Sequence, residues 1–105
     1  MLDRIKRLLN LGSSVDFKTL VSNGAIIVDV RTSGEFAAGH IKGAINIPVD
    51  QLKNNLNKLK NKEAPIITCC ASGMRSASAK SLLNANGYSH VHNGGGWSSL
   101  QSKII

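Results

Sequence analysis

The residues of this chain with the clearest chemical potential form one short segment, Cys70-Ala71-Ser72-Gly73-Met74-Arg75. The segment follows an apolar run at residues 65–69 and precedes a helix-like stretch that begins near Ser76. A strand, a short loop of small residues and a helix N-terminus would direct several backbone N–H groups at the cysteine, where they stabilise negative charge. The thiolate is the nucleophilic form of cysteine. The pattern therefore predicts a reactive sulfur, and it favours an enzyme over a passive binding module.

Apolar runs and helical patterns alternate along the chain, and this alternation sets the expected architecture. Strands are expected at residues 25–30, 44–47, 66–69 and 88–92, with a short strand or turn at 15–17. Helices are expected at residues 35–38, 50–59 and 76–86, near 20–24 and from Trp97 onwards. Such alternation is typical of α/β proteins. It predicts a doubly wound, mostly parallel five-stranded sheet with helices on both faces.

Sites in open parallel sheets form outside the carboxyl ends of the strands, where neighbouring loops meet. Four loops of this chain qualify by their position, and they cover residues 31–33, 48–51, 70–75 and 93–96. The loop that begins at Cys70 follows a strand that reads as central, because it is continuously apolar. The position and the chemistry of Cys70 therefore agree.

Length and composition bound the class of protein. The 105 residues suffice for one compact domain, expected over residues 13–105, with residues 1–12 as an N-terminal amphipathic helix or extension. With no long apolar run and no secretory leader, the expectation is a cytoplasmic protein without a membrane span. The net charge of +7 favours anionic partners, but no basic cluster is interleaved with aromatic residues, so nucleic acid is not expected.

Three blocks of sequence, in this order, resemble the rhodanese-like (sulfurtransferase) domain. The blocks are Asp29-Val30-Arg31 with the run from Glu35 to Pro48, the segment from Cys70 to Ser76, and Gly87-Tyr88 with the run from Asn93 to Trp97. The resemblance covers residues 15–97 and is that of a single-domain member. It departs from the family's pattern at Ala71, where arginine is frequent, and at Cys69, which adds a second thiol.

The resemblance implies that Cys70 takes sulfane sulfur from a small anionic donor such as thiosulfate and becomes a persulfide. The sulfur then passes to a thiophilic acceptor, which is cyanide, a small thiol or a protein cysteine. The loop of Ala71, Ser72, Gly73, Met74, Arg75 and Ser76 is implied to surround the sulfur, and no cofactor or metal is implied. Successive N–H groups in a tight turn form an anion-binding concavity, which suits an anionic persulfide. Arg75 suits an oxyanion leaving group such as sulfite; the alternative is that it bonds the final carbonyls of a neighbouring loop.

Two other classes of function are weighed against this one. Cysteine-dependent phosphatases place five residues between Cys and Arg, whereas only four, residues 71–74, intervene here. This shorter loop disfavours a phosphatase or an arsenate reductase. A non-catalytic sulfur carrier or thiol redox-sensing module remains an alternative, with the Cys69/Cys70 pair as the signal.

Several residues are expected to support the site without taking part in the chemistry. Asp29 is expected to accept backbone N–H bonds, Arg31 to pair with Glu35, and His40 to tether its turn through a hydrogen bond. Trp97 is expected to cover a wall of the pocket, and the glycines at 94–96 to let their loop pass close to Cys70.

Two further patterns are interpreted as structural. Because side chains alternate along a strand, Cys69 should face a packed layer if Cys70 faces the loop; a redox role is the alternative. His90 and His92 lie two residues apart without a nearby carboxylate, so no metal site is expected.

Overall fold

The structure is a computed structural model and describes residues 15–105. The helix predicted for residues 1–12 lies outside the described residues. The strands are β1 (Ile26–Asp29), β2 (Ile45–Asn46), β3 (Ile66–Cys70) and β4 (Val91–Gly96), and they form one parallel sheet in the order β2-β1-β3-β4. The α/β class, the parallel sheet and the helices on both faces are confirmed.

The prediction of five strands is wrong for the part of the chain that the structure describes, where the sheet has four strands. The segment expected to contribute a short strand or turn at residues 15–17 instead starts the helix α2 (Phe17–Ser22). The Asp16 carboxylate accepts the Thr19 N–H at 3.0 Å and the Thr19 hydroxyl at 2.7 Å, which is N-cap geometry. An aspartate in this position stabilises a helix start, so the local polar contact prevails over the apolar pattern.

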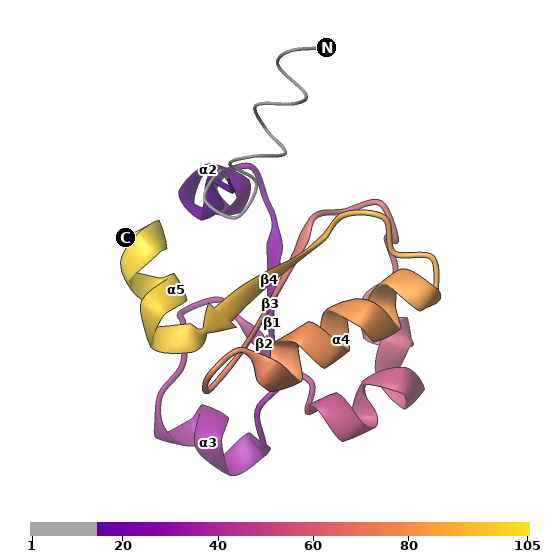
Figure 1. The fold of residues 1–105 in the computed structure, drawn as a ribbon, viewed down its shortest axis with the longest axis horizontal. Helices are drawn as coiled ribbons and strands as arrows, with labels where there is room; N and C mark the ends of the chain where they lie inside the picture. Colours follow the sequence, from indigo (N-terminus) through magenta and orange to yellow (C-terminus); the bar gives the residue numbers. More distant parts are fainter. Residues whose placement is uncertain (1–14) are drawn as a thin grey trace.

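Helices cover both faces of the sheet (Figure 1). One face carries α2 and α5 (Trp97–Ile104), which pack beside one another. The other carries the 3₁₀ segment η2 (Val49–Lys58) and α4 (Met74–Ala85), while α3 (Ser33–Ala38) lies beyond the carboxyl ends of the strands. Each face buries an apolar cluster. No helix within residues 15–105 is long and apolar enough to cross a membrane.

Alternation along β3 sends the two cysteines to opposite faces of the sheet. Cys69 packs in the cluster with Ile27, Ile67 and Leu100 under α5. Cys70 belongs to the cluster under α4 and η2. The expectation that Cys69 faces a packed layer is therefore confirmed.

The end of β4 is irregular next to Cys70. Thr68 pairs with Asn93 and Cys70 pairs with Gly96, so one residue of β3 opposes two residues of β4, which is a β-bulge. A Cβ atom at Gly96 would lie only 2.9 Å from the Ala71 carbonyl oxygen. Because glycine has no Cβ, β4 can approach the Cys70 loop closely, as predicted. The glycines expected to form a loop are the last residues of the strand.

Candidate active site

Cys70 lies where the order in which strands are added to the sheet reverses. From β1 the chain passes to β2 on one side, and from there to β3 on the other side of β1. The carboxyl ends of β1 and β3 thus flank the topological switch point, where α/β sheets bind their ligands. Cys70 is the last residue of β3.

Backbone N–H groups converge on the Cys70 sulfur. Gly73 N–H donates to Sγ at 2.9 Å and Ser76 N–H donates at 3.3 Å. The Ser76 hydroxyl lies 3.5 Å from the same atom. Gly73 is the N-cap residue of α4. Its φ of +104° is a left-handed conformation, which glycine adopts without steric cost. This turn directs N–H groups with no partner inside the helix at the sulfur.

The surroundings of Cys70 lower the pKa of its thiol below the ordinary value of 9.0. Burial acts in the opposite direction and raises the pKa, since the residue has 0% exposed surface. Hydrogen bonds from the Ser76 hydroxyl and from the N–H groups of Ser76, Gly73 and Ser72 outweigh the burial. Donors that favour the thiolate therefore compensate for its removal from water.

The neighbouring thiol has the opposite character. Burial in the apolar cluster raises the pKa of Cys69 to about 12, and the Asp29 carboxylate adds to the effect. No side-chain hydrogen bond of the described residues stabilises the Cys69 thiolate. Two adjacent thiols, both without exposed surface, thus differ in acidity because burial dominates at Cys69, whereas Cys70 receives hydrogen bonds from the loop.

Arg75 forms a bidentate ion pair with Glu35 of α3. Its Nη1 lies 2.7 Å from Glu35 Oε1, and its Nη2 lies 3.1 Å from Oε2. Hydrogen bonding to Arg75 lowers the pKa of Glu35 to about 2, and the Thr32 N–H contributes further by its bond in a capping box. Arg75 therefore joins the Cys70 loop to α3, with its charge already paired.

The expectation that Arg31 pairs with Glu35 is wrong in this structure. Arg31 forms a buried pair with Asp29, whose Oδ2 lies 2.7 Å from Arg31 Nη2, and it reaches Glu35 only through the backbone oxygen at 3.3 Å. The pairing follows from the strand end, where Asp29 also accepts the Arg31 N–H at 3.0 Å. The guanidinium donates further to the Gly39 carbonyl at 2.7 Å. This buried pair fixes the chain as it leaves β1.

Two other residues predicted to support the site hold the segment after α3. The His40 ring nitrogen Nδ1 lies 2.7 Å from the Phe36 carbonyl oxygen, and the two rings stack at 3.7 Å. Trp97 covers the Arg31 guanidinium, 4.6 Å from the ring centroid. Its ring edge would lie 3.3 Å from a Cβ at Gly39. Trp97 therefore packs over the buried ion pair and is not among the residues that line the hollow described next.

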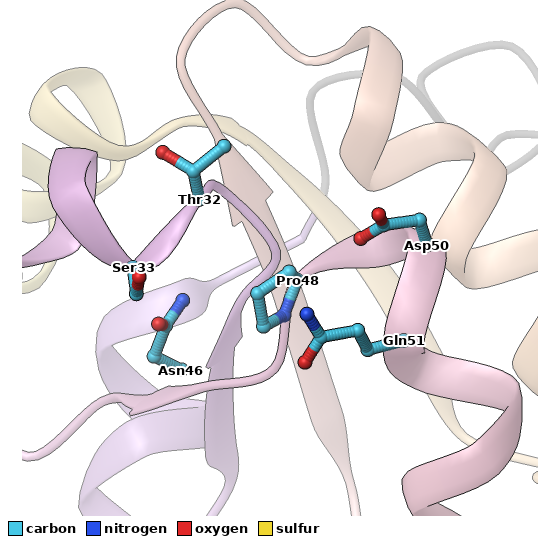
Figure 2. A pocket seen from close by; sticks show the side chains of 6 residues that line it. All are labelled: Thr32, Ser33, Asn46, Pro48, Asp50 and Gln51. Atoms are coloured by element: carbon cyan, nitrogen blue, oxygen red, sulfur yellow. The ribbon is translucent and has the colours of Figure 1, made fainter.

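A hollow of about 320 Å³ opens at the same edge of the sheet, beside β1 and β2 (Figure 2). Two of the four loops expected at this edge, residues 31–33 and 48–51, contribute to its lining. The lining side chains are polar apart from one proline, and they are Thr32, Ser33, Asn46, Pro48, Asp50 and Gln51. In the segment that follows Cys70, Met74 is 80% exposed. Within residues 15–105, no three His, Cys, Asp or Glu side chains gather closely enough to hold a metal ion.

Asn93 belongs to this site, although sequence reasoning singled out only its loop. Its Oδ1 accepts the Ser76 hydroxyl at 2.6 Å and the Gly95 N–H at 2.9 Å. Thr68 was also missed, and its hydroxyl donates to the Ser76 carbonyl at 2.9 Å. A polar residue at a strand end before three glycines was the only sequence signal for Asn93.

The comparisons with known proteins agree with this fold. Residues 13–103 match the family model of the rhodanese-like domain, and the chain belongs to that family. Human single-domain sulfurtransferase TSTD1 superimposes with a TM-score of 0.70 at 32% identity, over 80% of this chain and 87% of that one.

Two bacterial proteins are similar to this chain in sequence, one named as an enzyme and one named as uncharacterized. The thiosulfate sulfurtransferase PspE of Escherichia coli (strain K12) is 36% identical over 70 residues, which are 66% of this chain and 67% of that protein. The uncharacterized protein YqhL of Bacillus subtilis (strain 168) is 38% identical over 81 residues, or 76% of this chain and 64% of that protein. The chain thus spans about two thirds of the length of these relatives.

Proposed function

We propose that this protein is a rhodanese-type sulfurtransferase that carries sulfane sulfur on Cys70. In the first step the Cys70 thiolate attacks the outer sulfur of a donor such as thiosulfate. A sulfur–sulfur bond forms to Cys70, the donor's own sulfur–sulfur bond breaks, and sulfite leaves with that electron pair. Cys70 becomes a persulfide that carries one negative charge.

In the second step a thiophilic acceptor, cyanide or a thiol, attacks the outer sulfur of the persulfide. The bond to Cys70 breaks and its electron pair returns to Sγ, so the thiolate is regenerated. This is double displacement through a covalent intermediate. The enzyme needs no net oxidant or reductant in either step, because each sulfur–sulfur bond that breaks is replaced by a new bond to the same sulfur atom.

The observation that carries the proposal is the ring of donors around one sulfur. Gly73 N–H at 2.9 Å and Ser76 N–H at 3.3 Å stabilise a thiolate before transfer and after release. The similarity to a protein named thiosulfate sulfurtransferase supports the same reaction class.

Two features shape how a donor reaches the sulfur. Cys70 has 0% exposed surface, so a donor reaches its sulfur only after a local rearrangement of the residues that cover it. Arg75 is paired with Glu35, so the backbone N–H groups receive most of the negative charge near the sulfur.

The test is to incubate the reduced protein with thiosulfate, weigh the intact protein, and then add cyanide and measure thiocyanate. We expect a gain of one sulfur atom, its loss on addition of cyanide, and many turnovers. Cys70→Ser should abolish loading, whereas the matched control Cys69→Ser should load normally. Loading on Cys69, or no loading from either thiosulfate or a low-molecular-weight persulfide, would contradict the proposal.

A sulfur carrier is the second candidate, and the complete burial of Cys70 favours it, because a covered persulfide is shielded from solvent. The same experiment separates the two functions. Stable loading without turnover, at every acceptor concentration, would identify a carrier. Hydrolysis of a phosphate ester that depends on Cys70 would instead support a cysteine-dependent phosphatase.

A further inference from the structure

The orientation of the Asn93 side chain is fixed by its neighbours. Oδ1 lies 2.9 Å from the Gly95 N–H, which can only donate, so the oxygen and not the nitrogen of the amide faces this group. The amide nitrogen then faces the Gly73 carbonyl oxygen at 3.4 Å. Asn93 therefore presents an acceptor, and no donor, to the Ser76 hydroxyl 2.6 Å away.

The single proton of the Ser76 hydroxyl has three acceptors within reach. They are Asn93 Oδ1 at 2.6 Å, the Gly73 carbonyl oxygen at 3.0 Å and Cys70 Sγ at 3.5 Å. The contact with Asn93 is the shortest, and Sγ of a neutral thiol is a weak acceptor. The hydroxyl thus donates to Asn93 while Cys70 is protonated, and the thiol S–H can donate to the oxygen of Ser76.

Ionisation of Cys70 changes this order. The sulfur loses its proton and becomes a charged acceptor, and hydrogen bonds to charged groups are about twice as strong as neutral ones. Asn93 Oδ1 and the Cys70 thiolate then compete for the same proton.

We propose that Asn93 is a positioning residue that holds the Ser76 proton away from Cys70 until the sulfur is a bare thiolate. This inference rests on the proposed role of Cys70 as the sulfur-carrying nucleophile. In the persulfide the negative charge lies on the outer sulfur, so Sγ no longer attracts the hydroxyl and the proton returns to Asn93. When the acceptor removes the outer sulfur, Sγ becomes the leaving thiolate, and the hydroxyl turns back to stabilise it.

The charged groups around Cys70 do not provide such a response. Arg75 of α4 is paired with Glu35 of α3, and Cys69 on β3 stays protonated because its pKa is about 12. The pKa of His92 on β4 is lowered by burial and by Lys80, so this side chain is neutral at pH 7. From η2, Asp50 lines the hollow beside β1 and β2 and makes no hydrogen bond to Cys70 or Ser76. Because none of these groups is altered in the variants below, the experiment isolates the Ser76 proton.

The test is the pKa of Cys70 in sulfur-free protein, measured as the pH dependence of its alkylation by iodoacetamide and of thiolate absorbance, with Cys70→Ser as the blank. Asn93→Ala should lower the pKa by about one unit, because the hydroxyl is then free to donate to the thiolate. Ser76→Ala should raise the pKa. In the Ser76→Ala background, Asn93→Ala should change it by less than about 0.3 unit, because no proton remains to be released.

Three outcomes would overturn the inference: an unchanged pKa in Asn93→Ala, a raised pKa, or the same shift with and without Ser76. Asn93→Ser, whose shorter side chain withdraws the acceptor but keeps a polar group, replaces the alanine variant if that one does not fold. The titration is independent of turnover. If Cys70 loads no sulfur but the shifts occur, the proposed function fails alone; if Cys70 loads sulfur without the shifts, only this inference fails.

Discussion

Selective alkylation of Cys70 over Cys69 is the sharpest prediction from the structure. Both cysteines have 0% exposed surface, so accessibility alone predicts equal rates. The thiolate is the reacting species, so the pKa decides the outcome. The perturbation is iodoacetamide at pH 8, applied to the folded, reduced protein.

The expected selectivity follows from the two pKa values. Cys70, with a pKa below 9.0, is roughly one-tenth thiolate or more at pH 8, whereas Cys69, with a pKa of about 12, is about one part in 10⁴ thiolate. The more basic thiolate is the better nucleophile, so the Cys69 thiolate reacts about 20 times faster than the Cys70 thiolate when both are ionised. Alkylation of Cys70 should therefore be at least about 40-fold faster.

Peptide mass spectrometry with fragmentation between the two residues measures each rate. Cys69→Ser should react like the wild type, and Cys70→Ser should be nearly inert at pH 8. In denaturant the two cysteines should react at similar rates, which controls for their intrinsic reactivity. Comparable alkylation rates of the two cysteines in the folded protein, or rapid reaction of Cys69 in Cys70→Ser, would show that the pKa of Cys70 is not below that of Cys69.

The remaining predictions concern stability and are measured by denaturant unfolding. Cys69→Ser places a hydroxyl in an apolar cluster and should cost about 1–3 kcal/mol, without changing sulfur loading; an undiminished stability would contradict the packing role. Arg31→Gln leaves Asp29 buried without its ion pair and should cost about 3–5 kcal/mol; a loss below 1 kcal/mol would argue against the pair. Gly94→Ala places a Cβ 2.8 Å from two side chains and 2.9 Å from the Thr68 oxygen, and should cost about 1–3 kcal/mol. The pKa of Glu35 is lowered from 4.5 to about 2 in the folded protein, so its contribution is complete above pH 4.5 and disappears as the pH falls towards 2. Wild type should thus exceed Glu35→Gln in stability at pH 6 and match it near pH 2, and a constant difference would contradict the ion pair.

Local patterns predicted much of this fold. The apolar runs located three strands and the first two residues of β4, and the small residues after Cys70 located the turn, because these signals lie within a few neighbouring residues. The prediction of a fifth strand was wrong at residues 15–17, because the Asp16 side chain caps the start of helix α2. The Cys69 and Cys70 environments were predictable because alternation along a strand is geometric.

The pairings between distant residues were not predictable. Both Glu35 and Asp29 are near enough in sequence to pair with Arg31. Glu35 instead pairs with Arg75, 40 residues away, because the fold brings these two residues together. Asn93 reaches Ser76 across 17 residues through a bulge that the sequence marks only as consecutive glycines. Partner choice between polar groups depends on tertiary geometry, which a single sequence does not specify.

The packing of α2 against α5 has a consequence for how this domain combines with others. The first and last helices of the described chain lie on the Cys69 face, with Lys103 Nζ 5.7 Å from the ring of Phe17, while the Cys70 sulfur faces α4. A fusion partner joined through either helix would therefore emerge from the layer behind the reactive centre. Under the proposed function, a domain appended in this way would lie on the Cys69 face of the sheet, whereas sulfur would be exchanged at Cys70, whose side chain faces the other layer.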